Sequence, residues 1–443
     1  MLIHFRSKQG LVTRSHDASG SGFMPLPSKS PNPNYNEQKF SWTRNAVKDL
    51  LAIFAAIFTS ALGYGILTVL ISFQMELNIK NEVLMSISAA VQIGAGVIFA
   101  RFLPSMGQKA GLINSVCVGS LISAACCLAL FFYPGYFLWL IVIYLLGTSF
   151  FICGVTRNTI MIDLTPTHVR ALVISIGTTL VAIGNSLGPI ILNLLQTGTS
   201  FVSFALASGF FLASMLPLSR LRKVDANVRE NKKIGIWRYI KNSPKIMFAG
   251  FCVSYAMSSA AAFLIIYGIR IGMPQSEASL LLSVLLFGTV FYIPLGYLTD
   301  ILNRRMLMVT FTILSLICAY QLLEVAGSHQ IYTLLFLLFG CLAGIKLPAV
   351  VLINEKYKPT QRLAVNSAFS RFSLIGNVTG LLSTGAIMGQ FGPQGLWLSI
   401  IIILLFFLLF CCVNYSHKFI KKDFNFSSLS IFNKHNNEQL SES

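Results

Sequence analysis

Three basic residues lie deep inside long apolar runs of the sequence: Arg157, Lys346 and Arg371. No Asp or Glu occupies the middle of such a run, so the sequence places no acid where it could neutralise them. In a bilayer a charge costs at least about 2.5–3.5 kcal/mol unless it faces water or a partner. Unpaired cations at depth favour an anionic or zwitterionic ligand, whose carboxylate or phosphate a guanidinium can hold with two hydrogen bonds. The alternative is that all three side chains snorkel toward the nearer membrane surface.

Four neutral polar residues in the same runs could add hydrogen bonds to such a ligand: Asn185, Asn377, Tyr64 and Tyr255. Bonds between neighbouring helices explain them equally well. The sequence contains no nucleophile elbow, metal-ligand cluster, carboxylate pair or nucleotide-binding loop, so we expect no enzyme, no cofactor and no metal site. The nine cysteines lack a CxxC pair and are interpreted as apolar packing residues.

The elements that must position these residues are membrane helices. The 443-residue chain is 55% hydrophobic and only 11% charged, with a mean hydropathy of +0.71, which indicates an all-α integral membrane protein. A spanning helix needs roughly 20 apolar residues, and the runs are continuous rather than alternating, which excludes a membrane barrel. The twelve predicted spans are 47–74, 82–103, 109–132, 136–162, 169–196, 198–219, 244–269, 276–300, 306–326, 330–353, 363–389 and 394–414.

Basic residues predict the orientation of these spans. Lys and Arg gather in the connections that follow even-numbered spans, whereas the other connections hold only Lys80 and Arg270. Because short cytoplasmic loops collect positive charge, both termini are predicted to be cytoplasmic, in a multi-pass protein of the bacterial inner membrane. This topology explains the net charge of +18 without a nucleic-acid partner. The expected partners are the lipid bilayer and a small-molecule solute, and we expect the chain to act as a monomer.

The chain divides into five segments. A tail over residues 1–45, rich in Pro, Ser and Asn, is predicted to be disordered, with an organelle transit peptide as the alternative. A six-helix half at 46–219, a basic linker at 220–243 and a second half at 244–415 follow, and 416–443 forms a second tail.

The two halves are related by an internal repeat. The stretch RALVISIGTTLVAIGNSLGP at 170–189 aligns with RLAVNSAFSRFSLIGNVTGL at 362–381, and the string Ile-Gly-Asn-x-x-Gly occurs in both. Internal duplication is typical of transporters whose ligand site lies between two halves that rock past each other.

The stretch GYLTDILNRR at 296–305 resembles the signature Gly-x-Leu-x-Asp-x-x-Gly-Arg-Arg of the major facilitator superfamily. The matching residues are Gly296, Leu298, Asp300, Arg304 and Arg305, with Asn303 in place of the later glycine. The resemblance covers about residues 45–415 and implies twelve helices in two pseudo-symmetric halves that transport by alternating access. The N-terminal copy of the signature has Pro104 at the position of the acid, which resembles a poorly characterised bacterial branch of the superfamily.

The family position of Asp300 suggests a latch. Its carboxylate would meet the positive N-terminus of the fifth helix near Arg170, beside Arg304 and Arg305, and hold the cytoplasmic ends of the halves together in the outward-open state. The alternative is a plain basic anchor with a solvated aspartate.

In the fifth helix, Gly184, Gly188 and Pro189 resemble a Gly-x-x-x-Gly-Pro element of exchangers, although close helix packing explains them nearly as well. The predicted function is secondary active or facilitative transport of a small organic solute, anionic or zwitterionic. The alternatives are a proton-coupled exporter of drugs or metabolites, which would want a buried acid, and a non-transporting sensor or scaffold.

Overall fold

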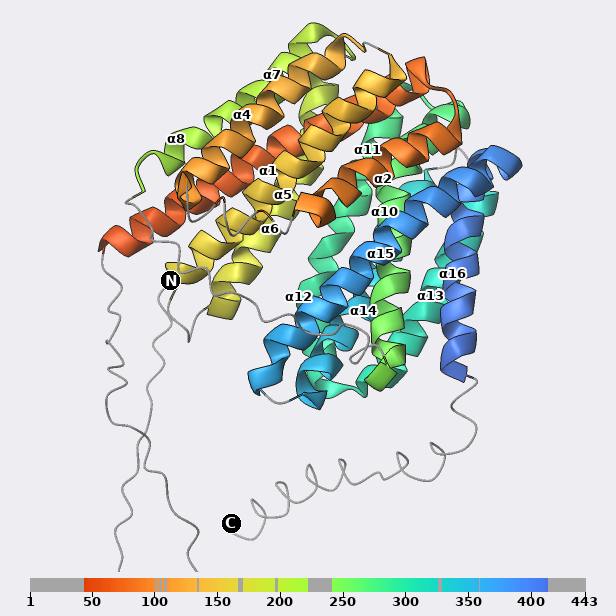
Figure 1. Ribbon diagram of the computed structural model, residues 1–443. Coiled ribbons are helices and arrows are strands. Elements are labelled where there is room, and N and C mark those ends of the chain that lie inside the picture. Colours follow the sequence, from red (N-terminus) through yellow and green to blue (C-terminus); the bar gives the residue numbers. More distant parts are fainter. Residues whose placement is uncertain are drawn as a thin grey trace, which may run out of the picture. The chain divides into compact units, whose positions relative to one another are not determined.

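The computed structural model describes residues 44–99, 102, 106, 110–133, 135–165, 170–195, 198–221, 241–325, 329–357 and 359–412. These residues all belong to one compact unit, Arg44–Ser443, and Figure 1 shows that it is built of helices. Most of the predicted linker, nearly all of both tails, and Pro104 lie outside the described residues.

The N-terminal half begins with the longest of the described helices. Its helices are α1 (Arg44–Asn78), α2 (Glu82–Phe99), α4 (Leu112–Phe131), α5 (Tyr136–Asp163), α6 (Arg170–Leu195), α7 (Phe201–Ala213) and α8 (Met215–Leu218). The first five lie within a few residues of the first five predicted spans, and α7 with α8 covers the sixth. The fifth helix begins at Arg170, close to its predicted start.

The C-terminal half is also built of helices. Its helices are α10 (Pro244–Arg270), α11 (Gln275–Phe287), η1 (Gly288–Phe291), α12 (Tyr292–Ile301), α13 (Arg304–Glu324), α14 (Gln330–Lys356), α15 (Pro359–Phe391), η2 (Gly392–Gln394) and α16 (Gly395–Cys412). Together with the first half they confirm the predicted all-α fold. We call the end of the unit where α1 and α10 finish the Arg270 end, and the opposite end, where both begin, the Arg304 end.

Two spans that the sequence predicts as single helices are interrupted. The sixth breaks at Ser214, between α7 and α8, and the eighth passes through the 3-10 turn η1. A proline ring clashes with the carbonyl four residues earlier in a helix. Pro217 stands four residues after Ala213, the last residue of α7, and Pro294 stands four residues after Val290 of η1, which accounts for both breaks.

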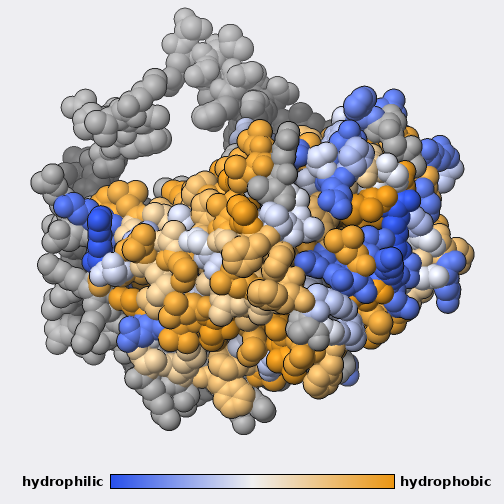
Figure 2. All heavy atoms as spheres, turned by 90° about the horizontal axis from the view of Figure 1, so that it is seen from above, coloured by the Kyte–Doolittle hydropathy of each residue, from blue (hydrophilic) through white to orange (hydrophobic). Residues whose placement is uncertain are grey.

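The surface of the unit suits a bilayer. Nine helical stretches of the described residues are long and apolar enough to cross a membrane, and the last of them, Val365–Cys411, covers most of both α15 and α16. Two shorter apolar helices lie at Glu82–Gly96 and Gln275–Phe287. Large apolar side chains are exposed on most helices, and hydrophobic residues cover much of the face in Figure 2. A surface of this kind is expected where lipid replaces water.

The repeated glycines let the first and fifth helices of each half approach closely. A Cβ atom on Gly188 of α6 would lie 2.6 Å from the Cα of Gly65 on α1, and one on Gly376 of α15 would lie 2.4 Å from the carbonyl oxygen of Phe251 on α10. The string Ile-Gly-Asn-x-x-Gly thus serves the same packing in both halves, as small residues do between membrane helices.

We predict that Gly188→Ala lowers the free energy of unfolding by about 1–3 kcal/mol, because the added methyl group would overlap the backbone of α1. Thermal unfolding in detergent measures the change. Gly209→Ala is the matched control, since a Cβ at Gly209 would meet nothing within 4 Å. Equal unfolding temperatures for the two variants would contradict the close packing of α1 and α6.

The halves meet along α2 with α15, α6 with α11, and α1 with α10. Figure 1 shows α2 and α15 side by side. At the Arg270 end this contact is tight, because a Cβ on Gly385 of α15 would lie 2.3 Å from the Cβ of Ser86 on α2. Near the Arg304 end the side chains of Ile174 and Ile176 on α6 are exposed.

Candidate functional site

A cavity of about 520 Å³ lies within the N-terminal half. Its lining residues come from α1, α2, α4, α5, α6 and α7, and all of them belong to this half. Helical spacing explains the contribution of α1, whose Ile57, Ser60, Ala61 and Tyr64 fall on one face at intervals of three and four residues. The volume is within the range of about 300–1,000 Å³ that is typical of small-ligand sites.

Arg157 of α5 lines this cavity and ties four helical segments together. Its Nη1 donates to the hydroxyl of Ser60 on α1, and its Nη2 donates to the hydroxyls of Ser214, at 3.2 Å, and Ser120 of α4, at 3.4 Å. Ser214 is the residue between α7 and α8, so the helix break supplies one of the three acceptors. The residue is only 6% exposed, and it does not snorkel toward the helix end.

The charge of Arg157 has no counter-ion among the described residues. Its three hydrogen-bond acceptors are neutral hydroxyls, and its Nε is buried without a hydrogen-bond partner in this part of the chain. A buried charge is costly unless it is paired and fully hydrogen-bonded. The site therefore holds one unit of positive charge that an anion could neutralise.

Two of the predicted neutral polar residues join Arg157 at the cavity. Asn185 of α6 lines it, and the side-chain Oδ1 of this residue is buried with no partner among the described atoms. Tyr64 of α1 also lines it and packs edge to face on Phe150, with ring centroids 4.7 Å apart. The structure thus brings together Arg157, Asn185 and Tyr64.

The other four predicted ligand residues lie in the C-terminal half and do not line this cavity. Tyr255 is buried, and its hydroxyl accepts a hydrogen bond of 2.5 Å from Ser383. The backbone carbonyl of Asn377 accepts one from Ser258 at 3.1 Å. Lys346 is half-buried in α14, and Arg371 is exposed on α15. A role for these four in ligand binding stays a prediction.

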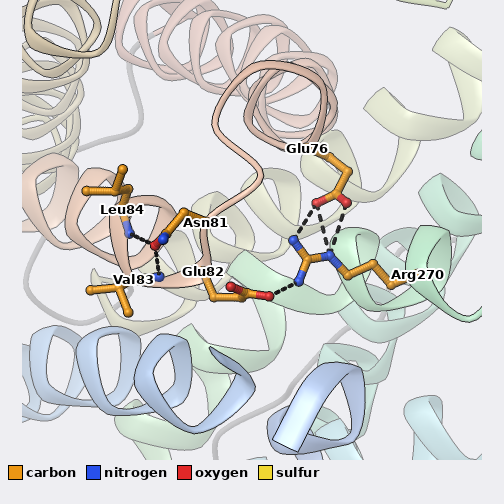
Figure 3. A network of polar contacts seen from close by, with 6 residues as sticks. All are labelled: Glu76, Asn81, Glu82, Val83, Leu84 and Arg270. Atoms are coloured by element: carbon orange, nitrogen blue, oxygen red, sulfur yellow. Dashed lines mark hydrogen bonds and ion pairs between the residues drawn. The ribbon is translucent and has the colours of Figure 1, made fainter. Parts of the chain in front are cut away.

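At the Arg270 end, a network of charges joins the two halves (Figure 3). Arg270 of α10 donates from Nε and Nη2 to the carboxylate of Glu76 on α1, at 3.0 to 3.2 Å, and from Nη1 to Glu82 of α2. The Arg270 and Glu76 side chains are 16% and 20% exposed. Asn81 fixes the start of α2 through its Oδ1, which accepts from the backbone N–H groups of Val83 and Leu84. We call Glu76, Glu82 and Arg270 the charge clamp.

The family signature at the Arg304 end makes contacts within its own half. Arg304 of α13 pairs with Glu355 of α14 and donates to the carbonyl of Thr299 at 3.1 Å. Asn303, which replaces the signature glycine, caps α13 because its side chain accepts from the N–H of Arg305 at 3.1 Å. Gly296 is half-buried with open space beside it.

The side chains of Asp300 and Arg170 lie outside the described residues, so the predicted latch between Asp300 and α6 stays a prediction. Pro189 is buried inside α6, near the glycines that contact α1.

The sequence did not reveal the serine acceptors of Arg157 or the partners of Arg270. Serine is common in membrane helices, and nothing in its spacing shows which hydroxyls face a cation on another helix. Arg270 offered a stronger signal. It is one of two basic residues in the connections expected to be poor in positive charge, and two acids stand near the ends of neighbouring spans.

The family model described as Major Facilitator Superfamily matches residues 22–189 and 246–424, which is well over half of the chain. The two matched segments correspond to the two halves of the structure. A search of curated proteins found no match.

Solved structures with a similar fold include several transporters. A mutant of the nucleoside transporter NupG is 12% identical and has a TM-score of 0.71, over 82% of this chain and 99% of that one. A bacterial homolog of the human lysosomal transporter Spinster, inward-facing and occupied, is 15% identical with a TM-score of 0.63, over 82% and 94%. A D-xylose–proton symporter is 13% identical with a TM-score of 0.64, over 81% and 96%. At these identities the likeness concerns the fold.

Proposed function

The chain belongs to the Major Facilitator Superfamily, and we propose that it moves a small organic solute, anionic or zwitterionic, across a membrane by alternating access. The observation that carries the choice of solute is Arg157, a guanidinium that lines the cavity and has no counter-ion among the described residues. A solute carboxylate or phosphate would supply the missing charge.

The charge clamp provides the closure at one end. Glu76 and Glu82 stand on the N-terminal half and Arg270 on the C-terminal half, so these ion pairs must separate when the Arg270 end opens. Water would then solvate the charges, which limits the free-energy cost of opening. In that state the Arg304 end would close, with Asp300, Arg305 and the start of α6 as its latch.

The membrane orientation and the monomeric state predicted from the sequence are part of the proposal. The Arg304 end faces the cytoplasm, because the connections there carry most of the Lys and Arg. Both termini then lie in the cytoplasm, and the cavity would exchange solute with the cytoplasm while the charge clamp is closed. A monomer contains both halves and suffices for the cycle.

Solute counterflow tests the proposal. The full chain is reconstituted in sealed liposomes preloaded with a mixture of unlabelled organic anions and zwitterions, and uptake of each labelled compound is followed. We expect exchange above protein-free vesicles for at least one anion or zwitterion, and none for organic cations. Exchange of cations alone would contradict the proposed solute class, and a complete absence of exchange would favour the sensor or scaffold alternative.

The same assay tests the two cations that lie away from the cavity. If Lys346→Ala and Arg371→Ala both lower exchange, the predicted ligand role of these residues gains support. Unchanged exchange in both variants would return them to the snorkelling interpretation.

A further inference from the structure

The cavity around Arg157 has aromatic walls. Phe150 packs on Tyr64 and lies 5.5 Å from Phe211, measured between ring centroids. All three rings line the cavity, and Phe151 adds a fourth. Walls of this kind hold the apolar body of a ligand, while a few polar groups fix its orientation.

The cavity presents one charge only. Among the described residues that line it, Arg157 is the single ionisable residue of charged type, and the other polar side chains are neutral amides, hydroxyls and a thiol. A ligand with two negative charges would find a cationic partner for only one of them among these residues. A ligand with one negative charge would be matched.

The side-chain amide of Asn185 can orient a ligand in the cavity. The amide lines the cavity from α6, and no carboxylate of the described residues lines this cavity. The amide oxygen is buried with no hydrogen-bond partner among the described residues. The NH2 group of this amide can donate a hydrogen bond to a bound anion, and its oxygen can accept one from a hydroxyl or an N–H group of the ligand. Gln92 of α2 and Asn158 of α5 provide further amides at the same cavity.

We propose that the solute of this protein is an organic monoanion with an aromatic or bulky apolar body, an aryl carboxylate being the simplest example, and that it binds in this cavity of the N-terminal half. The carboxylate neutralises Arg157, the amide of Asn185 orients it, and the ring packs among Tyr64, Phe150 and Phe211. This inference rests on the proposed transport function, whose solute it specifies.

The repeat does not duplicate the cation of this cavity. Arg157 of α5 aligns with Ala349 of α14, at the same offset that relates Arg170 to Arg362 and Asp163 to Glu355. The C-terminal half therefore has no guanidinium at the corresponding position. Ala349 is fully buried and belongs to the hydrophobic core.

Thermal unfolding of the purified full chain in detergent, with small probes at millimolar concentration, tests the inference. The probes are benzoate, acetate, benzamide and benzylammonium. Benzoate is expected to raise the unfolding temperature in a saturable manner, with acetate at least about tenfold weaker because it lacks the ring. Benzamide and benzylammonium are expected to give no shift, because neither carries a negative charge.

A matched pair of variants locates the binding. Asn185→Asp keeps the shape of the side chain but places a carboxylate at the cavity that Arg157 lines, so benzoate binding is expected to weaken at least about tenfold. Asn114→Asp makes the same change at an exposed position of α4 and is expected to leave benzoate binding as in the original chain. If the carboxylate introduced by Asn185→Asp upset folding, the unfolding temperature without ligand would reveal it. Thr178→Asp would then place a carboxylate on the same wall of the cavity at an exposed position, with the same expected loss of benzoate binding.

Three results would overturn the inference: no stabilisation by benzoate, equal stabilisation by benzamide, or benzoate binding that Asn185→Asp and Thr178→Asp leave unchanged. Failure of this inference is distinct from failure of the transport function. Counterflow of small hydrophilic anions without benzoate binding would refute the aromatic monoanion and retain transport. Benzoate binding without any counterflow would do the reverse.

Discussion

Replacing Arg157 with methionine is expected to lower exchange of organic anions about 100-fold, since loss of the charged partner of a bound anion costs about 2–5 kcal/mol. The unfolding temperature without ligand should stay the same or rise. Replacing buried charges by apolar side chains of similar volume is often neutral or stabilising by about 1–4 kcal/mol. A residue that served only the stability of the bundle would give the opposite result.

Two of the serine partners of Arg157 would keep a hydrogen bond in the Arg157→Met variant. The hydroxyl of Ser60 donates to the carbonyl of Ile57 at 2.9 Å, and that of Ser214 donates to Phe211 at 2.7 Å. These hydroxyls therefore keep a hydrogen bond when the guanidinium is gone, and the substitution leaves no donor of theirs unpaired.

Exchange in proteoliposomes and thermal unfolding in detergent measure the two effects on the same preparation. Lys241→Met removes an equal charge from an exposed position and should change neither quantity. If Arg157→Met lowered the unfolding temperature sharply and kept anion exchange, Arg157 would be a structural cross-link and not a ligand.

The second large effect is expected at the charge clamp. Arg270→Glu would place three carboxylates where two now share one guanidinium. Because the side chains are mostly buried, we expect the closed state of this end to lose about 1–3 kcal/mol, which shifts its population roughly ten- to 100-fold. Exchange should fall, since the cycle needs both ends to close in turn.

Spin labels report the position of this end directly. Labels at Lys80, after α1, and Gln390, near the end of α15, are both exposed and lie on opposite halves. The distance between them should lengthen in Arg270→Glu and return when Glu76→Arg is added, because the reversed pair restores attraction. A distance distribution unchanged by Arg270→Glu would show that close helix packing, such as that of Gly385 against Ser86, closes this end without the clamp.

The fold followed from the sequence because hydropathy alone specifies where a chain must be helical in a bilayer. Even the two interrupted helices have a sequence cause, since Pro217 and Pro294 follow the two breaks within one helical turn. A proline alone does not predict a helix break, because Pro189 and Pro348 lie inside α6 and α14 without ending them. Tertiary packing decides which prolines a helix accommodates.

The site was less predictable. Arg157 stood out because a lone cation in an apolar run has few explanations, and Asn185 and Tyr64 were named with it. Lys346 and Arg371 are candidates on the same grounds of depth in a helix, but depth does not show which face of the helix a side chain occupies. Contacts between helices, such as those of Ser214 or Glu82, depend on the rotation of each helix about its axis, which a single sequence does not determine.

The placement of the cavity within one half has an evolutionary consequence. After a gene duplication both copies start with the same binding residues, and each constrains the other only as long as both touch the cargo. Once recognition resides in the first copy, the second can drift in composition, and the aligned positions Arg157 and Ala349 now differ in charge. New cargo preferences can then arise by substitutions in fewer than half of the codons, while the moving parts on the other side are inherited intact.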